Sequence, residues 1–143
     1  CSSYGDVESG TNNTGGFAGG VSGSATVSNN YSIGSVISSG SDVGGFIGQI
    51  VDITNTVGNN YSAANFLSGG GNVHAFAGNV NASATMSNNY WDNDLVNDTN
   101  DAGKFEGLTT LEMENSANFT GWDFTNTWRV FSGKTPELIS APN

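Results

Sequence analysis

Apolar and aromatic residues recur along this chain at one fixed spacing. Three phenylalanines and three tyrosines each sit in similar local contexts, and successive members are 29 or 30 positions apart in both series: Phe17, Phe46, Phe76 and Tyr31, Tyr61, Tyr90. Two independent markers with one period indicate internal repeats, because a period of about 20 to 50 residues is typical of solenoids and arrays. The pattern therefore predicts a repeat protein over residues 1–91.

Within each period, β-branched and aromatic residues are separated by Gly, Asn and Ser clusters. The apolar positions are Phe17, Val21, Val27, Tyr31, Ile33 and Val36, then Phe46, Ile50, Ile53, Val57, Tyr61 and Phe66, then Phe76, Val80, Ala84, Met86 and Tyr90. Such runs predict short strands joined by tight turns. No stretch keeps a helical period over three turns. The expected fold is all-β, a parallel β-helix (β-solenoid) of about three coils of 29–30 residues.

Coils stacked about 4.8 Å apart place equivalent side chains in ladders. We expect the phenylalanines to form an internal aromatic ladder, with the flanking glycines at corners of positive φ or close backbone approach. The paired asparagines should form two amide ladders that hydrogen-bond along the stack, Asn29/Asn59/Asn88 and Asn30/Asn60/Asn89.

The character of the chain changes after residue 91. Residues 92–103 form an acidic polar linker, and residues 104–143 are rich in aromatic side chains. Thr109 with Glu112 three positions later forms a capping box, which predicts one short helix near 110–116. Because a solenoid needs a terminal unit over its last coil, we expect residues 104–143 to be a small C-terminal cap.

Composition narrows the function classes. Hydrophobic residues make up 36% of the 143 positions and there are 21 glycines, which suits a thin-cored solenoid better than a compact globule. Three basic against 13 acidic residues give a net charge of −10. That charge argues against nucleic acid and anionic membranes as partners. The single cysteine, Cys1, excludes an internal disulfide, and no apolar run is long enough to predict a membrane span.

The Gly-Phe-x-Gly element at Gly45–Gly48 and the Asn-Asn-Tyr-Ser element at Asn59–Ser62 resemble, with their period, the GLUG motif family of bacterial and archaeal surface proteins. The chain departs from the family by having Asn where the family has Cys, and His74-Ala75 in place of Gly-Gly. Cys1, one position before the equivalent of the tyrosine, lies where the family often has its Cys. The tail from Gly107 onward also looks like the segment that closes such arrays.

The resemblance implies an extracellular or cell-surface location and a non-catalytic structural or adhesive module. A stiff rod would display its polar surface to glycans, to surface proteins or to other copies of itself. A second hypothesis is a filament subunit whose open first coil accepts another chain end to end. The start at Cys1 is compatible with a segment cut from a longer array or with a lipidated N-terminus.

Two further alternatives rest on the residues alone. A polysaccharide-degrading β-helix enzyme would need clustered carboxylates, and Asp6, Asp42 and Asp52 do not align between coils. His74 stands alone at a glycine position of the motif and is expected to be a surface corner residue. An ice-binding face would need regular threonine rows; counted from the phenylalanines, Thr56 is offset by one residue from Thr26 and Thr85.

Two candidate modification or ligand sites remain. Acidic and amide oxygens of the linker are the ligands that Ca²⁺ prefers, although their spacing matches no EF-hand and a solvated loop is the alternative: Asp92, Asp94, Asn97, Asp98 and Asp101. No other cofactor is expected. Six Asn-x-Ser/Thr triplets are candidate glycosylation sites, or accidents of an Asn- and Ser-rich composition: Asn12, Asn30, Asn60, Asn81, Asn97 and Asn118.

Overall fold

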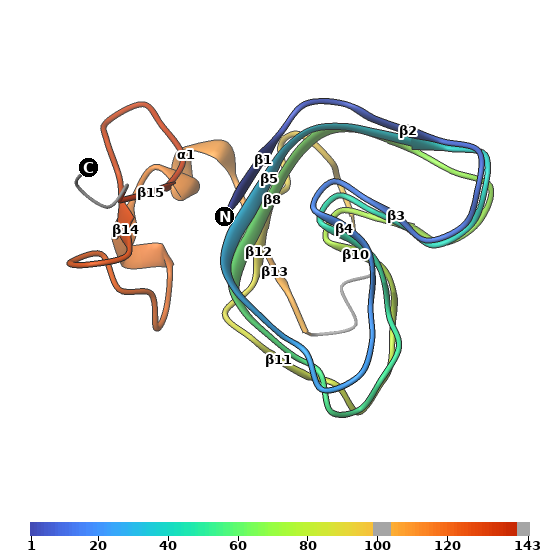
Figure 1. Cartoon of the computed structure of the whole chain (residues 1–143). Helices are drawn as coiled ribbons and strands as arrows, with labels where there is room; N and C mark the ends of the chain where they lie inside the picture. The colour runs from blue at the N-terminus through green and yellow to red at the C-terminus, as the bar shows by residue number, and fades with distance from the viewer. Residues whose placement is uncertain (99–103, 140–143) are drawn as a thin grey trace.

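The computed structural model describes residues 1–98 and 104–139. These residues form a parallel β-solenoid of about three turns, which confirms the predicted fold class. Figure 1 looks along the stack, so that the successive coils nearly superimpose. The C-terminal residues lie beside the coils rather than over them.

Three parallel sheets run along the solenoid, and a fourth, antiparallel one lies outside it. The long sheet contains β1 (Ser2–Tyr4), β2 (Val7–Ser9), β5 (Thr26–Ser38), β8 (Thr56–Ser68), β11 (Thr85–Ser87), β12 (Tyr90–Asp92) and β13 (Glu106–Leu108). The inner sheets are β3 (Thr14–Gly15), β6 (Val43–Gly44), β9 (Val73–His74) and β4 (Ala18–Val21), β7 (Ile47–Ile50), β10 (Ala77–Val80). The antiparallel pair is β14 (Trp128–Arg129) and β15 (Glu137–Leu138).

The register follows the tyrosine marker. Tyr31 pairs with Tyr61, and Tyr61 pairs with Tyr90. Ser2 pairs with Tyr31, so the first residues occupy the place predicted for them, one coil earlier. Two strands, β5 and β8, reach 13 residues and are longer than the short strands expected. Each contains an asparagine with positive φ, where the strand bends: φ is 57° at Asn29 and 56° at Asn59.

The predicted offset of the threonines is wrong. Thr26, Thr56 and Thr85 are register partners, and all three side chains are exposed. The second coil does contain one more residue, but the corner before Thr56 accommodates it. There the buried side chain of Asn55 donates to the Val21 carbonyl and accepts from the Ala25 N–H, both at 3.1 Å. Ile53, expected in the apolar stripe, lies at this corner with 61% of its surface exposed.

The predicted phenylalanine ladder fills the interior. Phe17 stacks on Phe46 with ring centroids 4.8 Å apart, and Phe46 packs on Phe76 at 5.0 Å. Phe105 continues the ladder, with its ring 4.5 Å from Phe76. Phe46 and Phe76 are almost completely buried. The side chain of Phe66, predicted to belong to the same apolar set, lies outside the description.

The glycines beside these phenylalanines allow backbones to touch at the centre of the coil. The chain reverses there between β6 and β7, so that the two strands lie against each other (Figure 1). A Cβ on Gly44 would collide with the Ile47 carbonyl oxygen and lie 2.8 Å from the Gly78 nitrogen. Close approach therefore explains these glycines. None of the glycines beside the phenylalanines has a positive φ; within the coils positive φ occurs at Asn13, Asn29, Asp42, Asn59 and Asn88 and at the more distant Gly5, Gly23 and Gly34.

The asparagine ladder, Asn30, Asn60 and Asn89, runs through the wall of the solenoid. The backbone N–H of Asn30 donates to Oδ1 of Asn60 at 3.0 Å, and that of Asn60 donates to Oδ1 of Asn89 at 3.2 Å. The side-chain amides donate in the same direction, from Asn30 to Oδ1 of Asn60 at 3.1 Å and from Asn60 to Oδ1 of Asn89 at 3.0 Å. In the second predicted ladder, Asn88 donates to Asn59 at 3.2 Å.

The C-terminal region has two parts. Phe105 and β13 lie on the last coil, where β13 pairs with β12. The lateral segment, residues 109–139, packs against the side of the solenoid (Figure 1). It contains α1 (Thr110–Met113) and the 3-10 helix η1 (Ser116–Asn118). The predicted capping box is present, since Thr109 and Glu112 exchange hydrogen bonds.

The lateral segment packs against a row of three tyrosines, Tyr31, Tyr61 and Tyr90, which we call the tyrosine row. The two stacked rings of Tyr31 and Tyr61 lie 4.9 Å apart and 2° from parallel. Trp128, fully buried, contacts both of them, and Trp122 stacks on Trp128 at 4.2 Å. Most of the described part of the predicted cap thus covers a side of the rod, whereas Lys104, Phe105 and β13 lie at its end.

Candidate functional site

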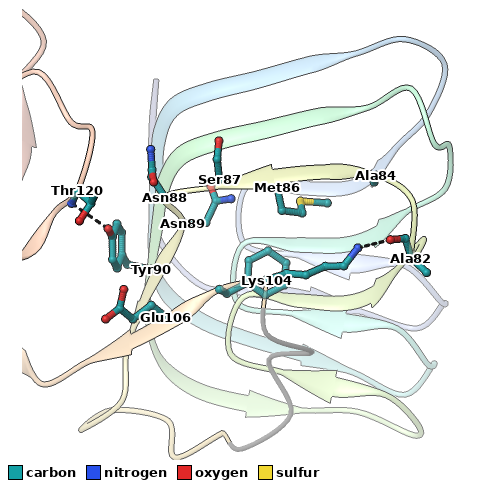
Figure 2. Close-up of a pocket in the computed structure, with 11 residues that line it drawn as sticks. Ala82, Ala84, Met86, Ser87, Asn88, Asn89, Tyr90, Lys104, Glu106 and Thr120 are labelled. Carbon is teal, nitrogen blue, oxygen red and sulfur yellow. Dashed lines mark hydrogen bonds between the residues drawn. The ribbon is translucent and has the colours of Figure 1, made fainter.

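A groove lies at the C-terminal end of the solenoid, between the third coil and β13 (Figure 2). We call it the end groove; its volume is about 760 Å³. Apolar atoms of Ala84, Met86 and Phe105 face Ser87, Asn88, Asn89 and Tyr90. It exists because β11 pairs with β8 on one side and has no strand partner among the described residues on the other.

Lys104 spans the end groove. Its Nζ donates to the backbone carbonyls of Asn81 at 3.2 Å and Ala82 at 2.7 Å, as Figure 2 shows for Ala82. One coil earlier, the carbonyl of Val51, the position that precedes Asn81 in the stack, accepts from the side-chain amide of Asn81 at 2.7 Å. The ammonium of Lys104 therefore replaces donors that a further coil would supply.

The end groove holds one carboxylate, Glu106, and one ammonium among the described residues. The Tyr90 hydroxyl already has a hydrogen-bond partner, because it accepts from the backbone N–H of Thr120 at 3.0 Å. Glycoside hydrolysis uses a pair of carboxylates flanking the bond. The side chains that line this groove do not provide such a pair, and its asparagine, lysine and tyrosine side chains are hydrogen-bonded within the chain.

A second cleft lies in the seam between the solenoid and the lateral segment. This seam cleft has a volume of about 320 Å³ and is lined by Tyr4, Ile33, Tyr61, Thr110, Glu114, Gly133, Lys134, Thr135 and Glu137. The Tyr61 hydroxyl forms part of its wall and donates to the Pro136 carbonyl at 2.8 Å. Tyr4 is 63% exposed, and its hydroxyl is hydrogen-bonded to that of Tyr31.

The tyrosine hydroxyls near this seam are held neutral. Burial, together with the hydrogen bond to Tyr4, raises the pKa of Tyr31 to about 12. Burial also raises the pKa of Tyr61 and of Tyr90. Deprotonation would place a charge in an apolar seam, so the phenols remain hydrogen-bond donors and acceptors at neutral pH.

The predicted calcium ligands separate into two places. Asp92 is buried and accepts from the Thr110 hydroxyl at 2.8 Å, while Asp94 accepts from the Thr110 N–H at 2.9 Å. Asp98 lies near β9, and Asn97 is exposed. Asp101 lies outside the described residues. Within residues 1–98 and 104–139, no group of three or more His, Cys, Asp and Glu side chains is placed to hold a metal ion.

His74 does not stand alone. Its Nδ1 lies 3.3 Å from a carboxylate oxygen of Asp98, which also accepts from the N–H of Ala75 at 2.7 Å. The prediction of an isolated corner residue is therefore wrong. A separation of 24 residues with no shared motif gave no sequence signal for this pair. The contact attaches the segment after β12 to β9, which is a structural role.

The six predicted glycosylation sites differ in accessibility. Asn30 and Asn60 belong to the asparagine ladder and are 8% and 0% exposed, with their amides hydrogen-bonded. Their burial speaks against a glycan on either, because the folded wall leaves no space for one. Asn12 and Asn97 are exposed, and Asn81 and Asn118 are half-buried. Modification at these four stays a prediction.

The sequence did not identify the seam cleft. Its residues come from β1, β5, β8, α1 and the last loop, which only the lateral packing brings together. A partial signal was present, since Tyr31 and Ile33 alternate with the inward Ser32 and thus place an apolar row on the outer face.

Comparison of the chain with protein-family models, with curated proteins and with solved structures finds no match. The described part of the chain has no helix with the length and apolar character needed to cross a membrane.

Proposed function

We propose that this chain is a non-catalytic structural and adhesive module of a secreted or cell-surface protein, in which a stiff solenoid displays a polar surface. One observation carries the proposal: the inward residues of the coils are used for packing. The phenylalanine ladder and the asparagine ladder run without interruption through the three coils. Such stacking resists bending, because a bend between any two coils would separate the ladder contacts that join them.

The outer surface supports display rather than catalysis. Thr26, Thr56 and Thr85 form a regular exposed row. The acids of the coils bind neighbouring backbone or amide groups: Asp6 accepts from the Ser35 N–H at 2.8 Å, and Asp42 from the Asn72 amide at 2.7 Å. Likeness to the GLUG motif family supports the same assignment. A net charge of −10 disfavours polyanionic partners, so neutral glycans and surface proteins are the expected ligands.

The test is a binding panel. Immobilised chain should retain particles coated with neutral glycans or with surface proteins, and it should not retain particles coated with polyanionic glycans or nucleic acid. A chain unfolded by the Phe46→Ala substitution is the control for non-specific adsorption. Failure to retain any glycan or any surface protein, with the chain folded by circular dichroism, would contradict the adhesive part of the proposal.

A filament subunit is the second candidate, and the unpaired side of β11 favours it. An open parallel edge can accept another strand. Against it, Lys104 and β13 already occupy part of that end. Electron microscopy of the purified chain distinguishes the two: fibres with an axial repeat support the filament, and dispersed particles support the adhesive module.

A further inference from the structure

We propose that the seam cleft is a binding site for one neutral sugar unit of a glycan, with Tyr4 as its stacking surface. This inference rests on the proposed adhesive function, because it names the site at which the glycan would bind. The cleft joins two parts of the molecule that are distant in sequence: the outer face of the first coils and the lateral segment.

The shape of the seam cleft suits a small ligand. Pockets that bind small molecules measure about 300–1,000 Å³, and the seam cleft, at about 320 Å³, lies at the lower limit. It therefore accommodates a single ring with its substituents, while the rest of a glycan would extend into solvent. Its walls come from three places: the long sheet, the helix α1 with its C-cap Glu114, and residues 133–137.

The apolar part of the site is an exposed aromatic surface. Tyr4 is 63% exposed, although its ring edge packs on Tyr31 at 89° and its hydroxyl is bonded to the Tyr31 hydroxyl. Both contacts fix the ring orientation. Ile33, the register partner of Tyr4, adds aliphatic surface beside it. The C–H face of a sugar ring is apolar and packs against such a surface. This contact favours binding, because it removes apolar surface of the sugar and of the aromatic ring from water.

The polar part consists of groups that suit hydroxyls. Glu114 and Glu137 bring carboxylate acceptors to the rim, and Lys134 brings a donor. Arg129 binds Glu137 at 3.3 Å and holds that carboxylate in place. Hydrogen bonds from neutral donors to carboxylates are among the stronger ones in proteins. An aromatic surface with carboxylates and one ammonium around it matches a ring that carries hydroxyls on its edge.

Charge selects the neutral class of sugar. Two carboxylates and one ammonium line the seam cleft, and the whole chain carries −10. A uronic acid or a sulfated sugar would bring a further negative charge beside Glu114 and Glu137. A neutral hexose-type unit avoids that repulsion.

The experiment is titration of the chain with soluble neutral oligosaccharides built from hexoses, followed by nuclear magnetic resonance. Shifts should occur at Tyr4, Ile33 and Lys134. Tyr4→Ala should weaken the affinity at least tenfold, and Tyr4→Phe, which keeps the ring, should retain most of it. Glu114→Gln should also weaken binding. The matched control is Ile53→Ala, because this apolar side chain is 61% exposed, close to the 63% of Tyr4, and does not line the cleft.

The outcomes separate the site from the function. If the wild type binds glycans and Tyr4→Ala binds equally well while Tyr4→Phe is also unchanged, the cleft is the wrong site and the adhesive function resides on another face. If only acidic oligosaccharides bind, the neutral class is wrong. If the folded wild type binds no oligosaccharide, the glycan site is overturned, and retention of surface proteins in the binding panel decides whether adhesion survives.

Discussion

Oδ1 of Asn60 accepts two hydrogen bonds from Asn30, one coil earlier: one from the backbone N–H at 3.0 Å and one from the side-chain amide at 3.1 Å. Asn60 in turn donates its own amide to the Val27 and Gly58 carbonyls, both at 3.0 Å. Its amide also lies 3.0 Å from Oδ1 of Asn89 in the next coil, so one fully buried side chain connects three successive coils.

Replacing Asn60 by Ala should destabilise the solenoid by roughly 2–4 kcal/mol, because several buried polar groups lose their partner at once. Denaturation with urea measures the loss. The exposed Asn97 is the matched control, and Asn97→Ala should change the free energy of unfolding by less than about 0.5 kcal/mol. Equal effects of the two substitutions would show that the ladder contributes no more than a surface amide.

Replacing Gly44 by Ala should cost about 1–3 kcal/mol or more, since the new methyl group would meet backbone atoms that cannot move aside. Gly10 is the control, because a Cβ there meets nothing within 4 Å. Gly10→Ala should be neutral or stabilising by up to about 1 kcal/mol. Thermal unfolding of the two variants compares them directly. A Gly44→Ala variant as stable as the wild type would rule out close approach as the reason for the glycine.

Replacing Trp128 by Ala should detach the lateral segment without unfolding the coils. The cavity against Tyr31 and Tyr61 corresponds to about 3–5 kcal/mol of lost packing. Limited proteolysis should then cut within residues 109–139 while the coils resist. Phe131→Ala, which removes an exposed aromatic of the same segment, should leave the cleavage rate unchanged. Simultaneous degradation of both parts would mean that the coils depend on this segment.

Stability should fall at alkaline pH. Burial and the hydrogen bond to Tyr4 raise the pKa of Tyr31 to about 12, whereas a tyrosine in an unfolded chain has a pKa of about 10. Below pH 10 both states are protonated and the stability is complete. Between about pH 10 and 12 the unfolded chain loses the proton of this tyrosine and the folded chain keeps it. The free energy of unfolding therefore decreases as the pH rises through this range.

The urea midpoint followed across this pH range measures the effect. Tyr31→Phe should flatten the fall, since its ring has no proton to lose. Tyr61 and Tyr90, whose pKa values are also raised, account for the remainder. An unchanged slope in Tyr31→Phe would assign the alkaline instability to other groups.

The repeat period was enough to predict the solenoid, because each coil has few ways to bury its apolar residues other than on the next coil. The ladder partners of Phe46 and Asn60 follow from it directly. The threonine row does not follow from the sequence in the same way, because Thr56 lies ten residues after its phenylalanine, whereas Thr26 and Thr85 lie nine residues after theirs. The extra residue of the second coil lies between the two markers, and only the buried side chain of Asn55 shows where it is accommodated.

The seam cleft and the lateral segment could not be predicted in the same way. Trp128 finds its place by contact with Tyr31, about a hundred residues earlier, and no period relates the two. The contact of His74 with Asp98 is equally non-periodic. The repeat period predicts how each coil packs on the next one. It does not predict where a segment outside the repeats will pack.

The lateral segment also constrains the number of coils that can lie between Tyr31 and Tyr90. Its tryptophans and Phe119 cover Tyr31, Tyr61 and Tyr90, one tyrosine for each of three successive coils. A coil inserted between these three would satisfy its own ladders, but it would move Tyr31 and Tyr90 one coil further apart, so that the present contacts of the lateral segment with both could not form together. The interior of the solenoid could therefore accept an inserted coil, whereas the packing of the lateral segment along its side could not.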